Sequence, residues 1–306
     1  MTNQRVFLFG AGASKGATHI WPYCPPLMRC LYVELVKYDP QEWGRLSAYA
    51  DRFRGDFEAT FCEEVLEIGK YGPARADTLT LLQKQRSLAC YFSQFLLDTS
   101  SMDYYSKLLA SLNAAGLIPD CFFASLNYDY LFEQAGRRLG LPVDYLCSES
   151  KSIRVAKLHG SCNFTTKISR SDRAQLASPG LHYEIHFEID FAETLKGKLS
   201  NHDYLPVMSQ VSPKKEDFLA PAKIQEMRNA WARALSSASY LAVIGVSYNQ
   251  NDTHVIEPIR NTEAKIGYIG GEDNFKKWKA ENKNFDHVGK KFEEDFNKII
   301  KWLEIE

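Results

Sequence analysis

The sequence lacks an excess of either charge. Across its 306 residues, 37 Lys and Arg balance 38 Asp and Glu, which leaves a formal net charge of −1. Binding to a nucleic-acid backbone needs a basic surface, so we expect no direct nucleic-acid partner. No apolar run approaches the roughly 20 residues that a membrane-spanning helix needs, and the polar N-terminus predicts no secretory signal. We therefore expect a cytoplasmic protein without membrane contact.

Cysteine pairs of the Cys-x-x-Cys type are also missing. Zinc ribbons need such pairs, so the sequence predicts no metal centre. An odd number of cysteines in a cytoplasmic setting favours free thiols over disulfides. The seven cysteines are Cys24, Cys30, Cys62, Cys90, Cys121, Cys147 and Cys162.

The most informative stretch that is present is an apolar run, Arg5 to Phe9, which leads into Gly10-Ala11-Gly12-Ala13-Ser14. An apolar run without alternation predicts a buried strand. The glycines allow a sharp turn and a close approach to a ligand, and free N–H groups in such a turn bind phosphate. A plain tight turn is the alternative on these residues alone.

Three later strands, expected at 120–124, 153–158 and 240–244, end in small or polar residues. A further strand at 265–269 closes with Gly270-Gly271. Strands that alternate with helices predict an α/β fold, a Rossmann-like doubly wound parallel sheet, in which ligands bind at the carboxyl ends of the strands. The residues that follow the three strands are Asn127, Asp129, His159, Gly245, Ser247 and Asp252.

Simple roles compete with a ligand site at these positions. Asn127 and Asp129 suit the cap of the helix that follows them, and a single histidine such as His159 is usually structural. For the whole chain we expect one domain over 1–306, with a helical insertion and a second insertion that holds a candidate strand at 182–191. The core is expected at about 1–27, 117–164 and 218–306, and the insertions at about 28–112 and 163–217.

Taken together, the blocks GAGAS, SLNYD, KLHGS and IGVSYNQND resemble the sirtuin-like family, in particular its bacterial NAD-hydrolase branch. The resemblance covers about 1–16, 117–164 and 218–271, with Ser125 in place of the usual threonine. Sirtuin deacylases carry a zinc module with two Cys-x-x-Cys pairs and a Pro-x-Phe-Arg cofactor loop, and this chain has neither. The resemblance therefore implies an NAD glycohydrolase that serves as an effector of anti-phage defence. A protein deacylase and a non-catalytic NAD or ADP-ribose sensor are the alternatives.

The resemblance also implies roles for individual residues, with NAD as substrate and without a metal. Asn127 would orient the ribose or the attacking water, and His159 would act as the general base. Asp129 would orient a partner group or cap its helix. The pyrophosphate would rest on Gly10, Ala11, Gly12 and Ser14, and the adenosine half would face Gly245, Ser247 and Asp252.

Uncontrolled NAD cleavage would harm its own host, so we expect activity to be gated. The chain shows no sensor domain, which favours control by a homo-oligomer or by a separate regulatory protein. By family resemblance, a translocase-type ATPase or an Argonaute-type protein is the expected partner. The insertions at 28–112 and 163–217 are the expected contact surfaces.

Overall fold

The computed structural model describes residues 4–61, 63, 75–145, 151–169, 189–191, 199, 201, 203–209 and 219–305. Within these residues, no helix is both long and apolar enough to cross a membrane. The chain forms two compact units. Unit 1 comprises Met1–Pro25, Phe95–His159 and Ile224–Glu306, and unit 2 comprises Pro26–Gln94 and Gly160–Lys223.

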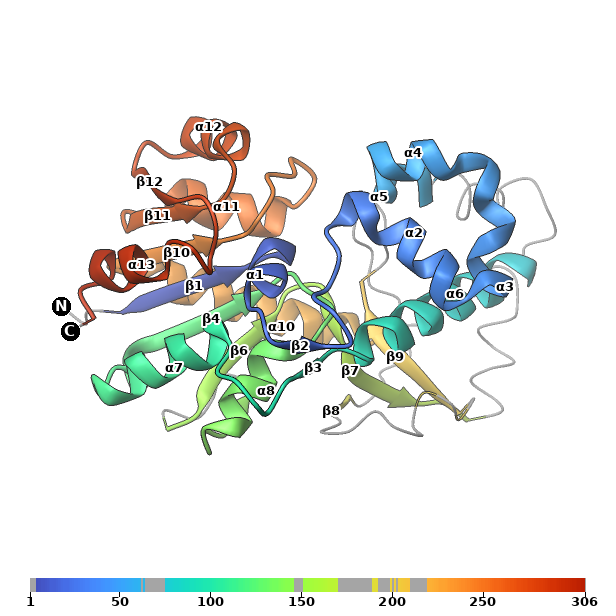
Figure 1. Ribbon diagram of the computed structural model, residues 1–306, viewed down its shortest axis with the longest axis horizontal. Helices are drawn as coiled ribbons and strands as arrows, with labels where there is room; N and C mark the ends of the chain where they lie inside the picture. The colour runs from blue at the N-terminus through green and yellow to red at the C-terminus, as the bar shows by residue number, and fades with distance from the viewer. Residues whose placement is uncertain are drawn as a thin grey trace. The chain divides into compact units, whose positions relative to one another are not determined.

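Unit 1 is built on a seven-stranded sheet with the order β12-β11-β10-β1-β4-β6-β5 (Figure 1). Every neighbouring pair in it is parallel. Apart from the short edge strand β5, this is the strand order of the doubly wound dinucleotide-binding fold, so the predicted fold class is confirmed. The strands are β1 (Arg5–Phe9), β4 (Cys121–Ser125), β5 (Val143–Asp144), β6 (Ile153–Lys157), β10 (Tyr240–Ile244), β11 (Lys265–Ile269) and β12 (Phe285–Gly289).

The central strands are buried because most of their side chains are apolar on both faces. All five residues of β1, of β4 and of β10 are buried, as a parallel sheet covered by helices on both faces requires. The register places Phe9 opposite Ser125 on one side and Ile244 on the other. The three strands therefore end at the same level, and the residues that follow them share one edge of the sheet.

Helices cover both faces of this sheet; α7 and α8 lie in front of the strands in Figure 1, and α10 lies behind them. On the front face, the ring of Phe9 packs against Tyr105 of α7 and Phe132 of α8, with centroids 5.2 and 4.9 Å apart. The helices of this part are α1 (Ala11–Gly16), α7 (Tyr104–Ala114), α8 (Leu131–Arg138), α10 (Pro221–Ser236), α11 (Thr253–Asn261), α12 (Glu272–Glu281) and α13 (Phe296–Trp302), with a 3-10 turn at Ile118–Asp120.

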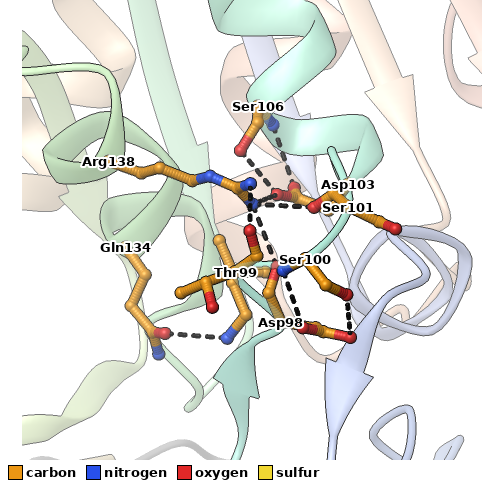
Figure 2. Close-up of polar contacts among 9 residues, drawn as sticks. Asp98, Thr99, Ser100, Ser101, Asp103, Ser106, Gln134 and Arg138 are labelled. Carbon is orange, nitrogen blue, oxygen red and sulfur yellow. Dashed lines mark hydrogen bonds and ion pairs between the residues drawn. The ribbon is translucent and has the colours of Figure 1, made fainter.

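A single arginine holds the segment that enters α7. Strands β2 (Ile20–Trp21) and β3 (Leu96–Leu97) pair antiparallel, and the chain then runs through residues 98–103. Figure 2 shows the Arg138 guanidinium among this segment. It donates to the carbonyls of Asp98, Thr99 and Ser101 at 2.9–3.2 Å, and it lies 3.7 Å from the buried carboxylate of Asp103. The planar fork of arginine allows one side chain to bind several carbonyls at once.

Unit 2 combines helices with a small antiparallel sheet of order β8-β7-β9. One turn of α6 (Arg75–Ser93) contacts both the helices and the segment that leads into β9. Lys84 donates to Glu42 at 2.8 Å, and Arg86 donates to the carbonyls of Leu199 and Tyr204 at 2.6 Å. The elements are α2 (Met28–Tyr38), α3 (Pro40–Trp43), a 3-10 helix (Gly44–Tyr49), α4 (Ala50–Gly55), α5 (Phe57–Phe61), α6 (Arg75–Ser93), β7 (Gly160–Lys167), β8 (Asp190–Phe191) and β9 (Tyr204–Met208).

These boundaries differ from the expected insertions in two ways. Helix α7, expected within the insertion 28–112, belongs to unit 1 because Tyr105 packs on Phe9 of the sheet. The other described residues of the two insertions, up to 94 in the first and from 163 in the second, belong together to unit 2. Of the candidate strand at 182–191, only β8 and the residue before it fall within the described residues. Cys24, Cys30, Cys90, Cys121 and Cys162 are free thiols, as expected, whereas Cys62 and Cys147 lie outside the described residues.

Candidate active site

The carboxyl ends of four adjacent strands carry the predicted site residues. In the order β10, β1, β4 and β6, the strands lead into Gly245, Gly10, Asn127 and His159. The structure thus brings the residues of all four blocks to one edge of the sheet, where open α/β folds bind their ligands.

The glycine turn packs directly on the end of β10. The N–H of Gly10 donates to Ile244 O at 3.0 Å, and the N–H of Gly12 donates to Gly245 O at 2.9 Å. A Cβ on Gly12 would lie only 2.8 Å from the Cα of Gly245, so the glycines allow two backbones to touch. Two of the N–H groups expected to hold the pyrophosphate are therefore bonded within the protein. The Ala11 N–H, at the start of α1, donates to no group among the described residues.

Asn127 joins this turn to the end of β4. Its side-chain nitrogen donates to Gly10 O and to Ser14 Oγ, both at 2.9 Å. Because a carbonyl can only accept, the amide nitrogen must face Gly10, which fixes the orientation of the amide group. The other side-chain atom, Asn127 Oδ1, accepts no hydrogen bond from the described residues and so keeps its lone pairs for a ligand.

Ser14 lies at the centre of a buried network. Its hydroxyl donates to Asp129 Oδ1 at 3.1 Å and accepts from Asn127, so the hydroxyl of Tyr105, also at 3.1 Å, must be a donor to it. Only 1% of Ser14 is exposed. The Ser14 hydroxyl, which we expected to bind a phosphate, is therefore buried and holds the side chain of Asn127 through a hydrogen bond.

Asp129 is a buried acid that holds the start of α8. Its Oδ1 accepts from the Leu131 N–H at 3.2 Å, and its backbone carbonyl accepts from Lys157 Nζ at 2.5 Å. Burial raises the pKa of Asp129 above the ordinary aspartate value, against the opposing effects of Lys157 and of the bond from Ser14. Two roles were expected for Asp129, to orient a partner group or to cap its helix. In the structure its carboxylate contacts both the start of α8 and the hydroxyl of Ser14.

His159 contacts two residues at the start of α11. Its Nε2 lies 3.5 Å from Asp252 Oδ1 and 3.1 Å from Nε2 of His254. Asp252 follows β10, which is three strands away from β6 in the sheet, yet its carboxylate lies beside His159. Asp252, expected at the adenosine half of the ligand, is thus beside the predicted base. Ser247 is exposed on the same loop.

The sequence interpretation did not include His254 in the site. The sequence feature that would have indicated His254 is its spacing from Asp252, since Asp252-x-His254 brings the two side chains together at the start of α11. A cavity of about 490 Å³ opens beside His254, between α10 and α11. Its wall carries Arg228, Asn229 and Glu257 and includes none of the glycine-turn residues.

Comparison with known proteins finds similarity in solved structures alone. No protein-family model and no curated protein matches the chain. A structure of Sir2 in complex with the inhibitor EX-527, 2'-O-acetyl-ADP-ribose and a deacetylated p53 peptide is 16% identical, with a TM-score of 0.47 over 99% of this chain and 95% of that one. A sirtuin structure from work on the structural basis of sirtuin substrate affinity is 17% identical, with a TM-score of 0.44 over 98% of this chain and 92% of that one. Both structures are sirtuins. The fold class of the present chain is assigned from its own strand order and register.

Proposed function

We propose that this chain is an NAD glycohydrolase that cleaves NAD to nicotinamide and ADP-ribose. The observation that carries the proposal is Asn127, whose amide nitrogen is bonded to the glycine turn while its Oδ1 stays available at the same sheet edge as His159. A carboxamide oxygen held in this way accepts a hydrogen bond from a ribose hydroxyl or from water. An imidazole on a nearby strand end accepts the proton that the reaction releases.

The reaction needs few groups from the protein. Water adds to C1' of the ribose, the bond from C1' to the nicotinamide nitrogen breaks, and nicotinamide leaves with the bonding electron pair as a neutral molecule. The proton of the attacking water passes to His159. The fixed amide of Asn127 holds the ribose or the water in line, so less orientational freedom is lost in the transition state. Since Gly10 and Gly12 donate to Ile244 and Gly245, the Ala11 N–H is the amide of the turn that remains for the pyrophosphate.

The test is product analysis with matched variants. Purified full-length chain is incubated with NAD, alone and with its candidate partner, and nicotinamide, ADP-ribose and cyclic ADP-ribose are separated by chromatography. Loss of a general base lowers turnover by roughly 10²–10⁴-fold, so His159→Ala should lose that much while it still binds NAD. Asn127→Ala should lose about 100-fold through lost orientation.

Two control variants keep the residue types constant. Asn113→Ala, on the exposed end of α7, and His287→Ala, on the edge strand β12, should cleave NAD like the wild type. Undiminished cleavage by His159→Ala or Asn127→Ala would refute the assigned roles. NAD consumption that requires an acylated peptide would favour a deacylase, and tight binding without turnover under every condition would favour a sensor.

In a cell, we propose that NAD depletion is the output of a bacterial anti-phage effector. The chain would then be held inactive until infection is reported, through a homo-oligomer or a regulatory partner such as a translocase-type ATPase or an Argonaute-type protein. Co-expression of the chain with each candidate should separate the two routes. A cleavage rate per chain that rises with protein concentration supports activation by an oligomer. A cleavage rate that requires the second protein supports activation by a partner.

A further inference from the structure

Three potential metal ligands, one of which is the predicted base His159, converge at the carboxyl edge of the sheet. His159, from the end of β6, and Asp252 and His254, from the start of α11, each offer one ligand atom, and these atoms lie within 4.8 Å of one another. In the described part of the chain, no other group of three His, Cys, Asp or Glu side chains is arranged in this way. His159 and Asp252 are buried, and His254 is partly exposed.

Two of the three distances within this cluster fit a tetrahedral ion. Zinc binds imidazole nitrogen and carboxylate oxygen at about 2.0–2.1 Å, and tetrahedral angles then place neighbouring ligand atoms about 3.3–3.4 Å apart. The observed separations from His159 Nε2 are 3.1 Å to His254 Nε2 and 3.5 Å to Asp252 Oδ1. These two separations are within a few tenths of an ångström of the tetrahedral value, and the third, between the ligand atoms of Asp252 and His254, is at most 4.8 Å.

The chemistry of the donors selects the class of ion. Two imidazoles and one carboxylate suit zinc, cobalt and similar first-row ions, whereas magnesium and calcium prefer sites built from oxygen. His254 also lines the cavity of about 490 Å³ between α10 and α11, so this member of the cluster is open to solvent.

We propose that His159, Asp252 and His254 bind one divalent cation of the zinc and cobalt class, and that the bound cation inhibits the chain. The second half rests on the proposed function, because a cation on His159 Nε2 occupies the lone pair that would accept the proton. Occupied and catalytic states are then mutually exclusive. Available zinc would act as an inhibitor of NAD cleavage.

Cobalt binding tests the site without reference to activity. Titration of the full-length chain with Co²⁺ should produce the visible absorption of a tetrahedral cobalt centre at one equivalent, and Zn²⁺ should displace it. His254→Ala should weaken binding by at least roughly 100-fold, since loss of an outer-shell partner alone costs about 10–100-fold. His287→Ala, which removes an imidazole from the edge strand, should bind like the wild type.

A gain-of-signal variant covers the case in which alanine disturbs the fold. His254→Cys replaces one ligand with a thiolate, so it should keep tight binding and add a sulfur-to-cobalt charge-transfer band. Equal binding by the wild type and His254→Ala, or a spectrum of His254→Cys without that band, would overturn the proposed site.

Inhibition is measured as the ratio of NAD cleavage in chelator to cleavage in saturating Zn²⁺, for each variant against itself. The ratio should be large in the wild type and should fall toward one in His254→Ala at the same zinc concentration. Cobalt binding without any NAD cleavage would support the metal site and count against the proposed function. Cleavage that zinc leaves unchanged in a chain that binds zinc at this site would overturn the inhibitory role.

Discussion

Replacing Gly245 with alanine tests how closely the glycine turn and strand β10 approach each other. Gly245 has a φ of +64°, which disfavours any side chain. A Cβ at this position would also overlap the backbone of Gly12 and the nitrogen of Ala13. Two separate penalties therefore act at one residue, whereas each other described glycine of unit 1 carries at most one of them.

The two penalties can be given magnitudes. The left-handed conformation costs a non-glycine residue about 1–2 kcal/mol, and overlap in a packed region costs about 1–3 kcal/mol. Gly245→Ala should therefore lower the free energy of unfolding of unit 1 by about 2–5 kcal/mol. Gly116, with a φ of +69° and no atom within 4 Å of a built Cβ, isolates the conformational cost. Gly12, whose penalty is the overlap alone, isolates the second cost.

The assay is urea unfolding of the full chain, followed by tryptophan fluorescence and, for unit 1 alone, by hydrogen exchange of the β1 and β10 amides. Gly116→Ala should cost about 1–2 kcal/mol, and Gly12→Ala about 1–3 kcal/mol. The double variant Gly12→Ala with Gly245→Ala should cost less than the sum of the two, since both relieve the same contact by separating the same backbones. The gain from a stiffer unfolded chain is similar for each glycine and cancels in the comparison.

The outcome that would refute this reasoning is a Gly245→Ala variant no less stable than Gly116→Ala. The glycine turn would then not lie against β10, and the N–H groups of Gly10 and Gly12 would be available to a ligand after all.

Three further changes probe other parts of unit 1. Ser14→Ala leaves polar groups of the buried network unpaired and should cost about 1–3 kcal/mol in urea unfolding; an unchanged midpoint would contradict the network. Arg138→Ala should increase hydrogen exchange across 98–103, and Arg138→Lys should not restore protection, because an ammonium lacks the fork that binds several carbonyls. The Asp295 carboxylate accepts from Lys298 and from the Lys290 N–H, which lower its pKa to about 2. Because the folded pKa lies below the unfolded value of about 3.9, this stabilisation is present above pH 4 and is lost as pH falls toward 2. Asp295→Asn should therefore reduce stability at pH 7 and flatten the acid limb of the pH profile, and an unchanged limb would contradict the assignment.

The strands of the core were predictable because each is an apolar run bounded by turn residues. The expected strands at 240–244 and 265–269 coincide with β10 and β11, and the expected strand at 120–124 is displaced from β4 by one residue. Strand β12 was missed because it is an edge strand, with polar Asp286 and His287 at positions that the sheet leaves partly exposed. Its sequence therefore lacks the continuous apolar pattern that identifies a buried parallel strand.

The supporting residues of the site could not be predicted in the same way. Tyr105 meets Ser14 across 91 residues, and His254 meets His159 across 95. Neither pair has a local signature, since one tyrosine in an amphipathic helix looks like any core residue. Their positions follow from where α7 and α11 pack on the sheet.

What the sequence determined by itself is therefore local. Apolar runs and glycines specify the strands and turns, and parallel strands must end at one edge, so the four blocks predict a shared site. Only the tertiary structure determined which groups at that edge are bonded within the protein and which side chains contact one another. The close approach of two backbones bonds the N–H groups of Gly10 and Gly12 within the protein, burial makes Ser14 and Asp129 supports for Asn127, and the position of the start of α11 brings Asp252 and His254 to His159. These outcomes depend on distances between elements far apart in the chain, which residue types and spacing do not encode.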